Sequence, residues 1–372
     1  MKKTIWLSLI LTTAMTGSAK AEEPVYFPDP NLQAVVEEAL GVANPTPTDM
    51  LGLRSYLIAA ERGIVDLRGI DYATNLRELY LENNQISDIS PLAKLKNLTT
   101  LWMFGNQIGD ISPLAELTNM LELLLSHNHI SDVSPLANLT ELFALYLGDN
   151  QISDVSTLAG LTNMSQFYLY ENQISDVSVL TGMTELTKLK LYDNQISDIS
   201  PLAGKTKLWC LALNDNQISD ISPLSGMADL LRLYAYNNQI IDVSVVATMT
   251  SLNQLRLDSN RISDISPLAG LTKLYELNLS GNPLNPAAYC EFLPLIFDNN
   301  ALWQFDCDPD PNPLTSDCST GVADLLEFTR HWLERGCGVE NNWCGGADLN
   351  HLNGVDLYDF AEFAGYWQAN VE

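Results

Sequence analysis

Residues 76–97 read LRELYLENNQISDISPLAKLKN, and this pattern returns along the chain with a period of 22 residues. Nine aspartates keep the same phase, from Asp88 to Asp264. A fixed period of about 20–29 residues indicates a solenoid, in which each unit buries its apolar face only against its neighbours. The asparagine of the pattern recurs in successive units as Asn84, Asn106, Asn128, Asn150, Asn172, Asn194, Asn216, Asn238, Asn260 and Asn282.

The polar residues of the repeat have structural explanations. A buried amide offers two donors and an acceptor, so we expect the asparagines to satisfy the backbone of the turn after each strand and to form a ladder. The phased aspartates are expected to cap the short helical turns that follow them. Calcium binding is the alternative for the aspartates. The apolar positions of the first unit are Leu76, Leu79, Leu81, Ile86, Ile89, Leu92 and Leu95, which we expect to point inward.

The repeat length and the wording Asn-Gln-Ile-Ser-Asp-Ile-Ser-Pro-Leu resemble internalin-type leucine-rich repeats over about residues 26–289. The resemblance implies an α/β solenoid, a horseshoe with a parallel β-sheet on its concave side and a helical N-terminal cap, and it implies protein binding. We assign residues 22–63 to the cap and residues 64–289 to the repeats, with ten strands starting at Leu76. In the cap, we expect one helix between Asp29 and Gly41 and a second around residues 50–59.

The concave face carries the candidate binding residues. Side chains alternate along a strand, so the third, fifth and seventh positions of each unit face the concave side. Ten parallel strands about 4.8 Å apart span roughly 45 Å. A continuous band of aromatic residues on such a face indicates recognition of a protein or a glycan. The alternative is that aromatic residues simply favour strands. The predicted ligand-binding residues are Tyr80, Trp102, Phe104, Tyr146, Tyr168, Tyr170, Lys190, Tyr192, Tyr234, Tyr236 and Arg256, with further positive charge from Lys188 and Arg232.

The composition changes after the repeats. Residues 290–312 are expected to hold a C-terminal cap and a proline-rich linker. Residues 313–372 contain two related loop–helix segments and resemble a dockerin, a small α-helical calcium-loop module. The resemblance implies docking on a cohesin-like scaffold and one Ca²⁺ site; an acidic turn before a helix is the alternative. The expected calcium ligands follow calcium-loop spacing at Asp348, Asn350, Asp356 and Asp359, and a weaker loop holds Thr315, Asp317 and Asp324.

The first 21 residues have the pattern of a signal peptide. Two lysines precede an apolar stretch, and Ala19-Lys20-Ala21 is a cleavage signal. We therefore expect cleavage near Ala21 and a secreted or cell-surface protein. No later apolar run is long enough to predict a transmembrane anchor. Export permits disulfides, and six cysteines allow fifteen pairings, of which Cys290–Cys307 and Cys337–Cys344 are the first to test; Cys210 is expected to be a free thiol, and zinc binding is the weaker alternative.

The charge and the absence of catalytic motifs in the sequence limit the functional classes to which the protein can belong. The net charge of −27 argues against nucleic acid as a partner. The sequence has no nucleophile elbow, phosphate loop or H-E-x-x-H motif, so we do not expect an enzyme. We predict a non-catalytic exported protein that recognises a protein or glycan through its concave face and carries a calcium-dependent docking module. One alternative is a targeting or assembly component of an extracellular polysaccharide-degrading complex. Another is a surface-stabilising structural protein without a specific ligand.

Overall fold

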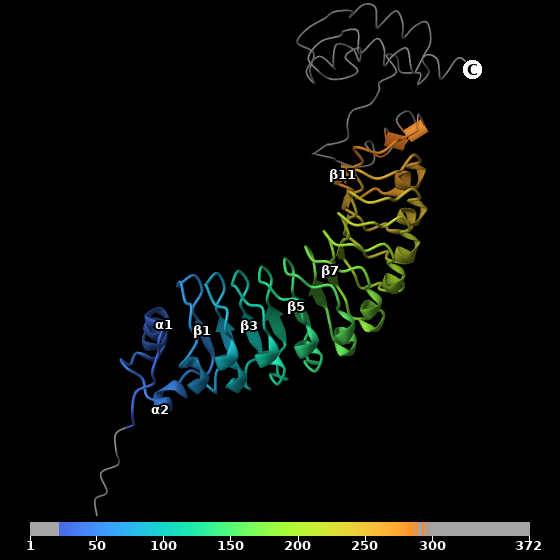
Figure 1. Ribbon diagram of the computed structural model, residues 1–372. Coiled ribbons are helices and arrows are strands. Elements are labelled where there is room, and N and C mark those ends of the chain that lie inside the picture. The colour runs from blue at the N-terminus through green and yellow to red at the C-terminus, as the bar shows by residue number, and fades with distance from the viewer. Residues whose placement is uncertain (1–21, 286, 289–291, 294–295, 297–372) are drawn as a thin grey trace, which may run out of the picture.

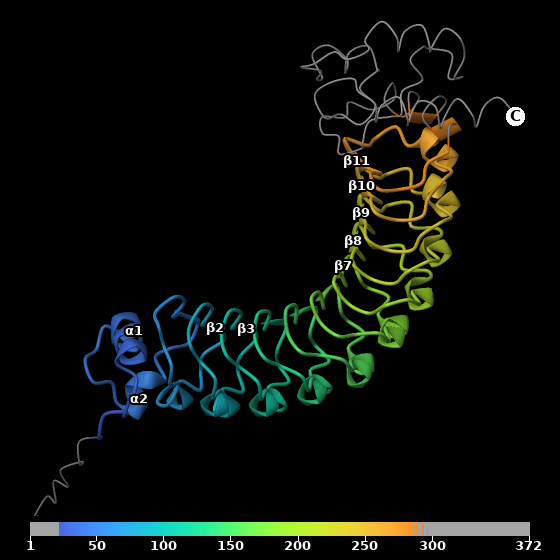
Figure 2. The ribbon, with the colours of Figure 1, turned by 45° about the horizontal axis from the view of Figure 1, so that its top comes forward.

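The computed structural model describes residues 22–285, 287–288, 292–293 and 296. These residues form a curved solenoid with strands on its concave side and short 3₁₀ helices on its convex side (Figures 1 and 2). The strands make one parallel sheet in which spatial order equals chain order. The predicted solenoid with a parallel concave sheet is therefore confirmed. The expected signal peptide, linker and calcium-loop module lie outside the described residues.

Each repeat contributes one three-residue strand and one turn of 3₁₀ helix. Neighbouring strands are in register at the 22-residue period, as in the pairing of Glu78 with Thr100. The strands are β1 (Tyr56–Ile58), β2 (Glu78–Tyr80), β3 (Thr100–Trp102), β4 (Glu122–Leu124), β5 (Ala144–Tyr146), β6 (Gln166–Tyr168), β7 (Lys188–Lys190), β8 (Cys210–Ala212), β9 (Arg232–Tyr234), β10 (Gln254–Arg256) and β11 (Glu276–Asn278). The 3₁₀ helices are η1 (Ile70–Tyr72), η2 (Ser90–Lys94), η3 (Ser112–Leu114), η4 (Ser134–Leu136), η5 (Ser156–Gly160), η6 (Ser178–Gly182), η7 (Ser200–Leu202), η8 (Ser222–Leu224), η9 (Ser244–Thr248) and η10 (Ser266–Gly270).

The first cap helix, α1 (Pro30–Leu40), forms as predicted. Asp29 accepts two backbone hydrogen bonds from its first turn, and Gly41 ends it with a left-handed φ of 66°. The second carboxylate oxygen of Asp29 accepts from the amides of Val65 (2.7 Å) and Asp66 (3.1 Å). Burial acts to raise the pKa of Asp29, but these four amide donors outweigh it and lower the pKa. One side chain thus starts the helix and also joins it to the first repeat.

The prediction of a helix around residues 50–59 is wrong. The second helix, α2 (Pro47–Met50), is shorter and earlier, and β1 lies inside the segment predicted to be helical. The strand is hidden in the sequence because polar or small residues replace the repeat leucines. Arg54 and Ala59 stand one period before the first and third leucines of the first full unit. The sheet consequently has eleven strands rather than ten.

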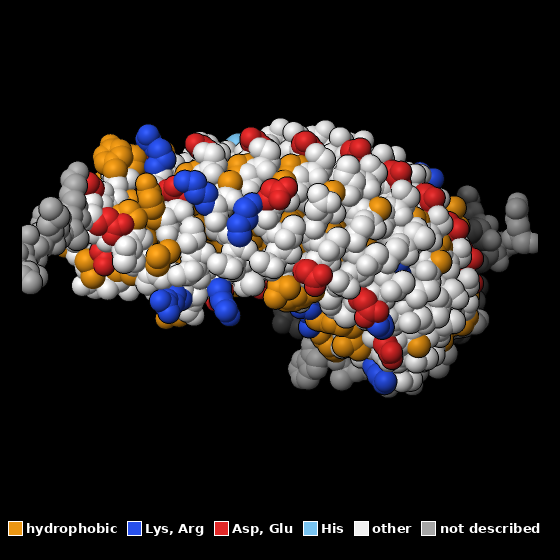
Figure 3. Space-filling view, turned by 90° about the horizontal axis from the view of Figure 1, so that it is seen from below, with side chains coloured by type: hydrophobic (Ala, Val, Ile, Leu, Met, Phe, Trp, Pro, Cys, Tyr) orange, Lys and Arg blue, Asp and Glu red, His pale blue; other side chains and the backbone are white. Residues whose placement is uncertain are grey.

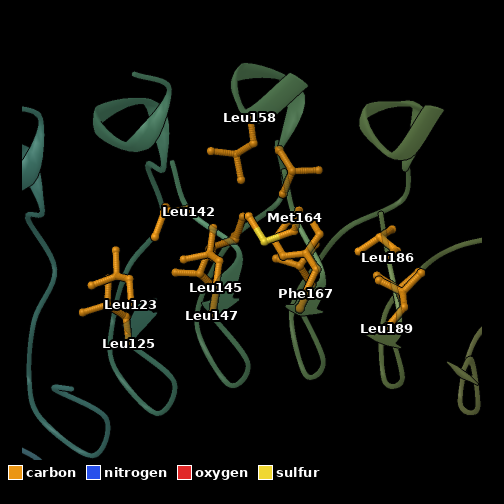
Figure 4. Close-up of a cluster of buried hydrophobic side chains, with 14 of the residues drawn as sticks. Leu123, Leu125, Leu142, Leu145, Leu147, Leu158, Met164, Phe167, Leu186 and Leu189 are labelled. Atoms are coloured by element: carbon orange, nitrogen blue, oxygen red, sulfur yellow. The ribbon is translucent and has the colours of Figure 1, made fainter. Parts of the chain in front are cut away.

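The core is a continuous stack of aliphatic side chains along the solenoid axis. Figure 4 shows four of its repeats, where Met164 and Phe167 fill positions that leucine takes in most other units, and both are fully buried. Lys205 breaks the pattern. It stands where neighbouring repeats have Met183 and Met227, and only 3% of its surface is exposed. Burial lowers the pKa of Lys205.

The asparagine ladder joins every repeat to the one before it. The Oδ1 of Asn172 accepts from the amide of Ile152 (2.9 Å), and its Nδ2 donates to the carbonyls of Leu147 (3.0 Å) and Leu169 (3.1 Å). The same three contacts recur at the other nine asparagines. The side chain therefore satisfies backbone groups of two adjacent turns.

The prediction that the phased aspartates cap the short helical turns is wrong in detail, because the N-cap residue of each 3₁₀ helix is the isoleucine or valine that follows the aspartate. Asp88 accepts from the amide of Ser90 at 2.8 Å, and the other eight repeat this contact. Each aspartate lies one residue before the usual capping position, so the contact is an Asx turn that leads into the helix. In the described part of the chain, no group of three or more His, Cys, Asp or Glu side chains is arranged to hold a metal ion.

Candidate protein-binding face

The predicted aromatic residues lie on the concave face as half-buried side chains. In β2 and β6 the middle residue is buried and its two neighbours are half-buried, which is the alternation expected of a sheet with one covered side. None of the nine aromatics is fully exposed, and six of them pack ring against ring in pairs. Their mutual packing fixes which ring surfaces remain open to a ligand.

Four tyrosines from three neighbouring repeats form the centre of this face. The rings of Tyr146 and Tyr168 stack with centroids 4.2 Å apart and 7° between their planes. The rings of Tyr170 and Tyr192 stack at 4.7 Å and 8°. We call these four residues the central tyrosines. Burial raises the pKa of each of them, so all four are neutral hydroxyl donors at neutral pH.

A glycine makes room for one of these rings. The ring of Tyr170 lies against the backbone of Gly148, and a Cβ atom at position 148 would overlap it. The Tyr146 hydroxyl is held separately, because it donates to Oε1 of Gln166 at 2.9 Å. The stacked arrangement thus depends on small and polar residues of adjacent repeats as well as on the tyrosines themselves.

The central tyrosines line a hollow of about 260 Å³. We call it the central hollow; its other lining residues are Phe104, Leu124, Ser126, His127 and Lys190. The Lys190 ammonium lies 4.5 Å from the ring centroid of Tyr168, within the range of a cation–π contact. Apolar, hydroxyl and cationic groups therefore converge on one open surface.

The expected continuous band of nine aromatics is divided by the structure. Between β7 and β9, the concave positions of the β8 repeat hold Ala212 and Asn214, which are only 5% and 4% exposed. Beyond this gap, Tyr234 donates to Gln254 at 2.9 Å, and Tyr236 lies 4.6 Å from the guanidinium of Arg256. The break arises because this repeat has no large side chain at either position.

A smaller aromatic group lies nearer the N-terminus. Tyr80 and Trp102 meet edge to face, with centroids 5.0 Å apart and planes at 85°. The Tyr80 hydroxyl donates to Oε2 of Glu78 at 2.9 Å. Burial, together with this carboxylate, raises the pKa of Tyr80 to about 12. Phe104 of the same repeat as Trp102 reaches the central hollow and links the two groups.

Two residues of this face escaped sequence reasoning. Trp209 precedes strand β8, so it is not at the third, fifth or seventh position of its repeat. Its ring nevertheless lies 5.0 Å from the Lys188 ammonium and 5.8 Å from the Arg232 guanidinium. The sequence holds one indication of this contact: Lys188 and Arg232 stand one repeat period before and after Cys210, the residue next to Trp209. His127 sits in the turn after β4; it lines the central hollow and contacts Asp149 at 2.7 Å.

Other parts of the surface and sequence are less informative. Seen from below Figure 1, the described surface is mainly uncharged, with hydrophobic side chains in small groups and acidic ones recurring along one edge (Figure 3). Cys210 is buried and forms no disulfide with any described residue. The other cysteines and both predicted calcium loops lie outside the described residues. Among the helices that the structure describes, none is long and apolar enough to span a membrane.

Comparison with known proteins places these features in a family. The model of leucine-rich repeats in two copies matches residues 74–116, 118–160, 162–204, 184–226 and 250–289. The solved internalin InlF from Listeria monocytogenes is 36% identical, covering 76% of this chain and 86% of that chain, with a TM-score of 0.71. The functional domain of InlJ from the same bacterium shares the fold at 22% identity, covering 76% of this chain and 64% of that chain, with a TM-score of 0.62.

A more distant similarity links the repeats to a receptor. A plant peptide hormone receptor, solved in a complex, is 25% identical, covering 57% of this chain and 41% of that chain, with a TM-score of 0.51. No protein with a curated function matches the sequence.

Proposed function

Because this chain belongs to the leucine-rich-repeat family and is similar to the internalins, we propose that it is a non-catalytic protein that binds another protein through its concave face. The central hollow carries the proposal, since half-buried tyrosines, a lysine and a histidine converge there. Tyrosines recur at protein-binding hot spots because they combine a large apolar ring with a hydroxyl group at low entropic cost. The signal-peptide pattern of residues 1–21 supports binding outside the cytoplasm, in a secreted or surface-displayed protein.

The ring geometry favours a protein over a glycan as the ligand. A sugar ring usually packs on an open aromatic face, whereas the central tyrosines cover one another's faces in two stacks. Lys190 covers a further part of Tyr168. One face of each ring is thus covered, and the ring surfaces and hydroxyl groups that remain suit the mixed apolar and polar side chains of a protein surface.

Site-specific photocrosslinking tests this proposal. We would place p-benzoylphenylalanine at His127, beside the central hollow, and as a matched control at Thr157, which is exposed on the convex η5. Irradiation of the cells that produce the full-length chain should yield a crosslinked protein from position 127 and none from position 157. The same crosslinks from both positions, or none from position 127, would contradict binding through the concave face.

We also propose that residues 348–359 bind one calcium ion. The support is the loop spacing of the acidic and amide side chains in the sequence, of which Asp356 is one. Calorimetric titration of the metal-free full-length chain with CaCl₂ should give one binding event, which Asp356→Ala abolishes and the control Asp317→Ala, in the weaker loop, retains. Absence of binding, or binding unaffected by Asp356→Ala, would sink the proposal. A calcium-dependent module would favour the alternative role of targeting component in a polysaccharide-degrading complex.

A further inference from the structure

Three cations lie in or beside the central hollow and have no acidic partner among the residues that the structure describes. Lys188 and Lys190 come from β7 and Arg232 comes from β9, and we call them the cationic cluster. In register, Lys188 and Arg232 flank Cys210, so they are two strands or about 10 Å apart. All three contact aromatic rings, with Lys190 over Tyr168 and the other two over Trp209. Their charged groups are therefore held over rings on the concave face.

Acidic partners are abundant in this chain, which has 46 acidic and only 19 basic residues. Five of the other described cations pair with carboxylates, as in the contacts of Lys207 with Glu185 (2.6 Å) and Arg256 with Asp258 (3.2 Å). Within the described residues, no member of the cationic cluster forms an ion pair. The positive charge is thus available to a carboxylate that arrives with a ligand.

Acidic residues line the opposite ends of the neighbouring strands. Four successive repeats have a carboxylate immediately before the ladder asparagine, and we call this the acidic row; its members are Asp149, Glu171, Asp193 and Asp215. All four have left-handed φ values between 51° and 55°. Glutamate rarely adopts this conformation, whereas four of the other repeats have asparagine or glycine here, as at Asn83 and Gly105.

The acidic row destabilises the turns in which its residues lie. Adjacent parallel repeats hold like charges side by side, which is destabilising. Burial raises the pKa of Glu171, and Asp149 and Asp193 raise it further. His127 contacts Asp149 at one end of the row at 2.7 Å, and Asn237 donates to Asp215 at 2.7 Å. Glu171 and Asp193 receive no side-chain hydrogen bond from the described residues. Basic groups of a ligand would relieve this repulsion.

The two charged groups face each other across the central tyrosines. Lys188 and Asp193 belong to one repeat and are five residues apart, which is roughly 15 Å along an extended chain. In the adjacent repeat, Tyr168 and Tyr170 stand at strand positions between those of Lys188 and Asp193. Each of these two rings belongs to one of the two stacks. The middle of the concave face therefore has Lys188 and Arg232 at one lateral edge, the aromatic rings with Lys190 in the centre, and the acidic row at the other edge.

We propose that the bound protein presents acidic side chains to the cationic cluster and basic side chains to the acidic row, so that charge fixes its orientation across the strands. This inference rests on the proposed function. Opposed charged edges favour one docking direction, because the reversed direction would bring like charges together. They also accelerate association in a manner that salt weakens.

Peptide selection tests the charge order and does not require the natural partner to be identified. A displayed library of random dodecapeptides would be selected on the immobilised full-length chain. Enriched peptides should carry aromatic residues between an acidic end and a basic end. Their binding should weaken roughly tenfold or more on the double variant Lys188→Glu/Arg232→Glu. The milder Lys188→Gln/Arg232→Gln pair should give a smaller loss, and the control Lys207→Glu should leave binding unchanged, since Lys207 already has an acidic partner.

The outcomes separate this inference from the proposed function. Peptides that lose binding on Tyr170→Ala and on both Lys188→Gln/Arg232→Gln and Glu171→Gln/Asp193→Asn support the charge order. Peptides that depend on Tyr170 but tolerate all charge variants overturn the charge order and leave the proposed function intact. Failure to enrich any peptide that depends on Tyr170 would count against recognition at the central hollow, and the charge order would fall with it.

Discussion

The interior of the solenoid and its concave surface follow opposite rules. Inside, the ladder asparagines make the same three hydrogen bonds in every repeat, as Asn172 illustrates. On the concave surface, one and the same position of the repeat holds Tyr168 in β6, Lys190 in β7 and Ala212 in β8. Each repeat must stack on the next, so the fold dictates the interior. The fold leaves the surface free to vary, and that freedom makes it the place where a partner can be specified.

The largest expected effect comes from breaking the interior. Asn172→Ala leaves the amide of Ile152 without its acceptor and removes one hydrogen bond to each of the carbonyls of Leu147 and Leu169, which keep their bonds from Asn150 and Asn194. The unsatisfied amide costs about 1–3 kcal/mol and each other lost hydrogen bond about 0.5–1.5 kcal/mol, so we expect the free energy of unfolding to fall by roughly 3 kcal/mol. Urea denaturation measures this. The control Asn163→Ala removes one exposed hydrogen bond to Thr140 and should cost less than about 1 kcal/mol. Equal decreases in the free energy of unfolding for both variants would show that the ladder hydrogen bonds do not stabilise the solenoid more than an exposed hydrogen bond does.

The next effect comes from disturbing the surface without removing an aromatic ring. Gly148→Ala places a methyl group where the ring of Tyr170 lies, so the ring must swing away. We expect partner binding to weaken roughly tenfold, or about 1.4 kcal/mol, with little change in stability. Gly160→Ala is the control, because its new methyl group would meet only the carbonyl of Ala137 at 3.7 Å. Titration of both variants with the crosslinked partner compares them, and unchanged affinity for Gly148→Ala would show that the stacked geometry is dispensable.

Replacing Lys205 would restore an apolar side chain at a core position where the neighbouring repeats have methionine. Lys205→Met matches the methionines of the neighbouring repeats, and we expect it to raise the free energy of unfolding by about 1–2 kcal/mol, because a buried amine is costly. The gain should shrink as the pH rises from the lowered pKa of Lys205 toward 10.5, since the wild-type lysine then becomes neutral. Urea denaturation at neutral and alkaline pH measures both. A destabilised variant at neutral pH would mean that the lysine has a stabilising partner.

The smallest effect is expected on the convex side. Asp198 accepts from the amide of Ser200 at 2.8 Å and from its hydroxyl at 3.0 Å, and these bonds lower its pKa. The stabilisation exists above the ordinary carboxyl pKa of 3.8 and disappears as the pH falls through the lowered value. Asp198→Ala should therefore lower the melting temperature slightly at pH 7 and leave it unchanged in strong acid. A loss of the same size at both pH values would show that the charge of Asp198 does not act through these bonds.

The sequence predicts the interior well and the surface only in part. The period of Asn84 and its nine counterparts specifies the repeat and the register of the sheet. The sequence does not reveal strand β1, because Arg54 and Ala59 replace repeat leucines. Its conformation is decided by tertiary pairing with β2. Alternation along the strands predicts which side the tyrosines face. It cannot predict the two stacks, because they depend on ring rotation and on the space above Gly148.

The most direct test of the contrast between interior and surface is a variant that changes only the surface. Replacing the central tyrosines together, as Tyr146→Ser, Tyr168→Ser, Tyr170→Ser and Tyr192→Ser, leaves every ladder asparagine and buried leucine in place. Circular dichroism and the affinity for the protein crosslinked at position 127 would be measured on the same sample. We expect the wild-type spectrum and cooperative unfolding, with affinity reduced at least about hundredfold. A folded variant that binds at wild-type affinity, or one that no longer folds, would contradict the separation of fold and recognition.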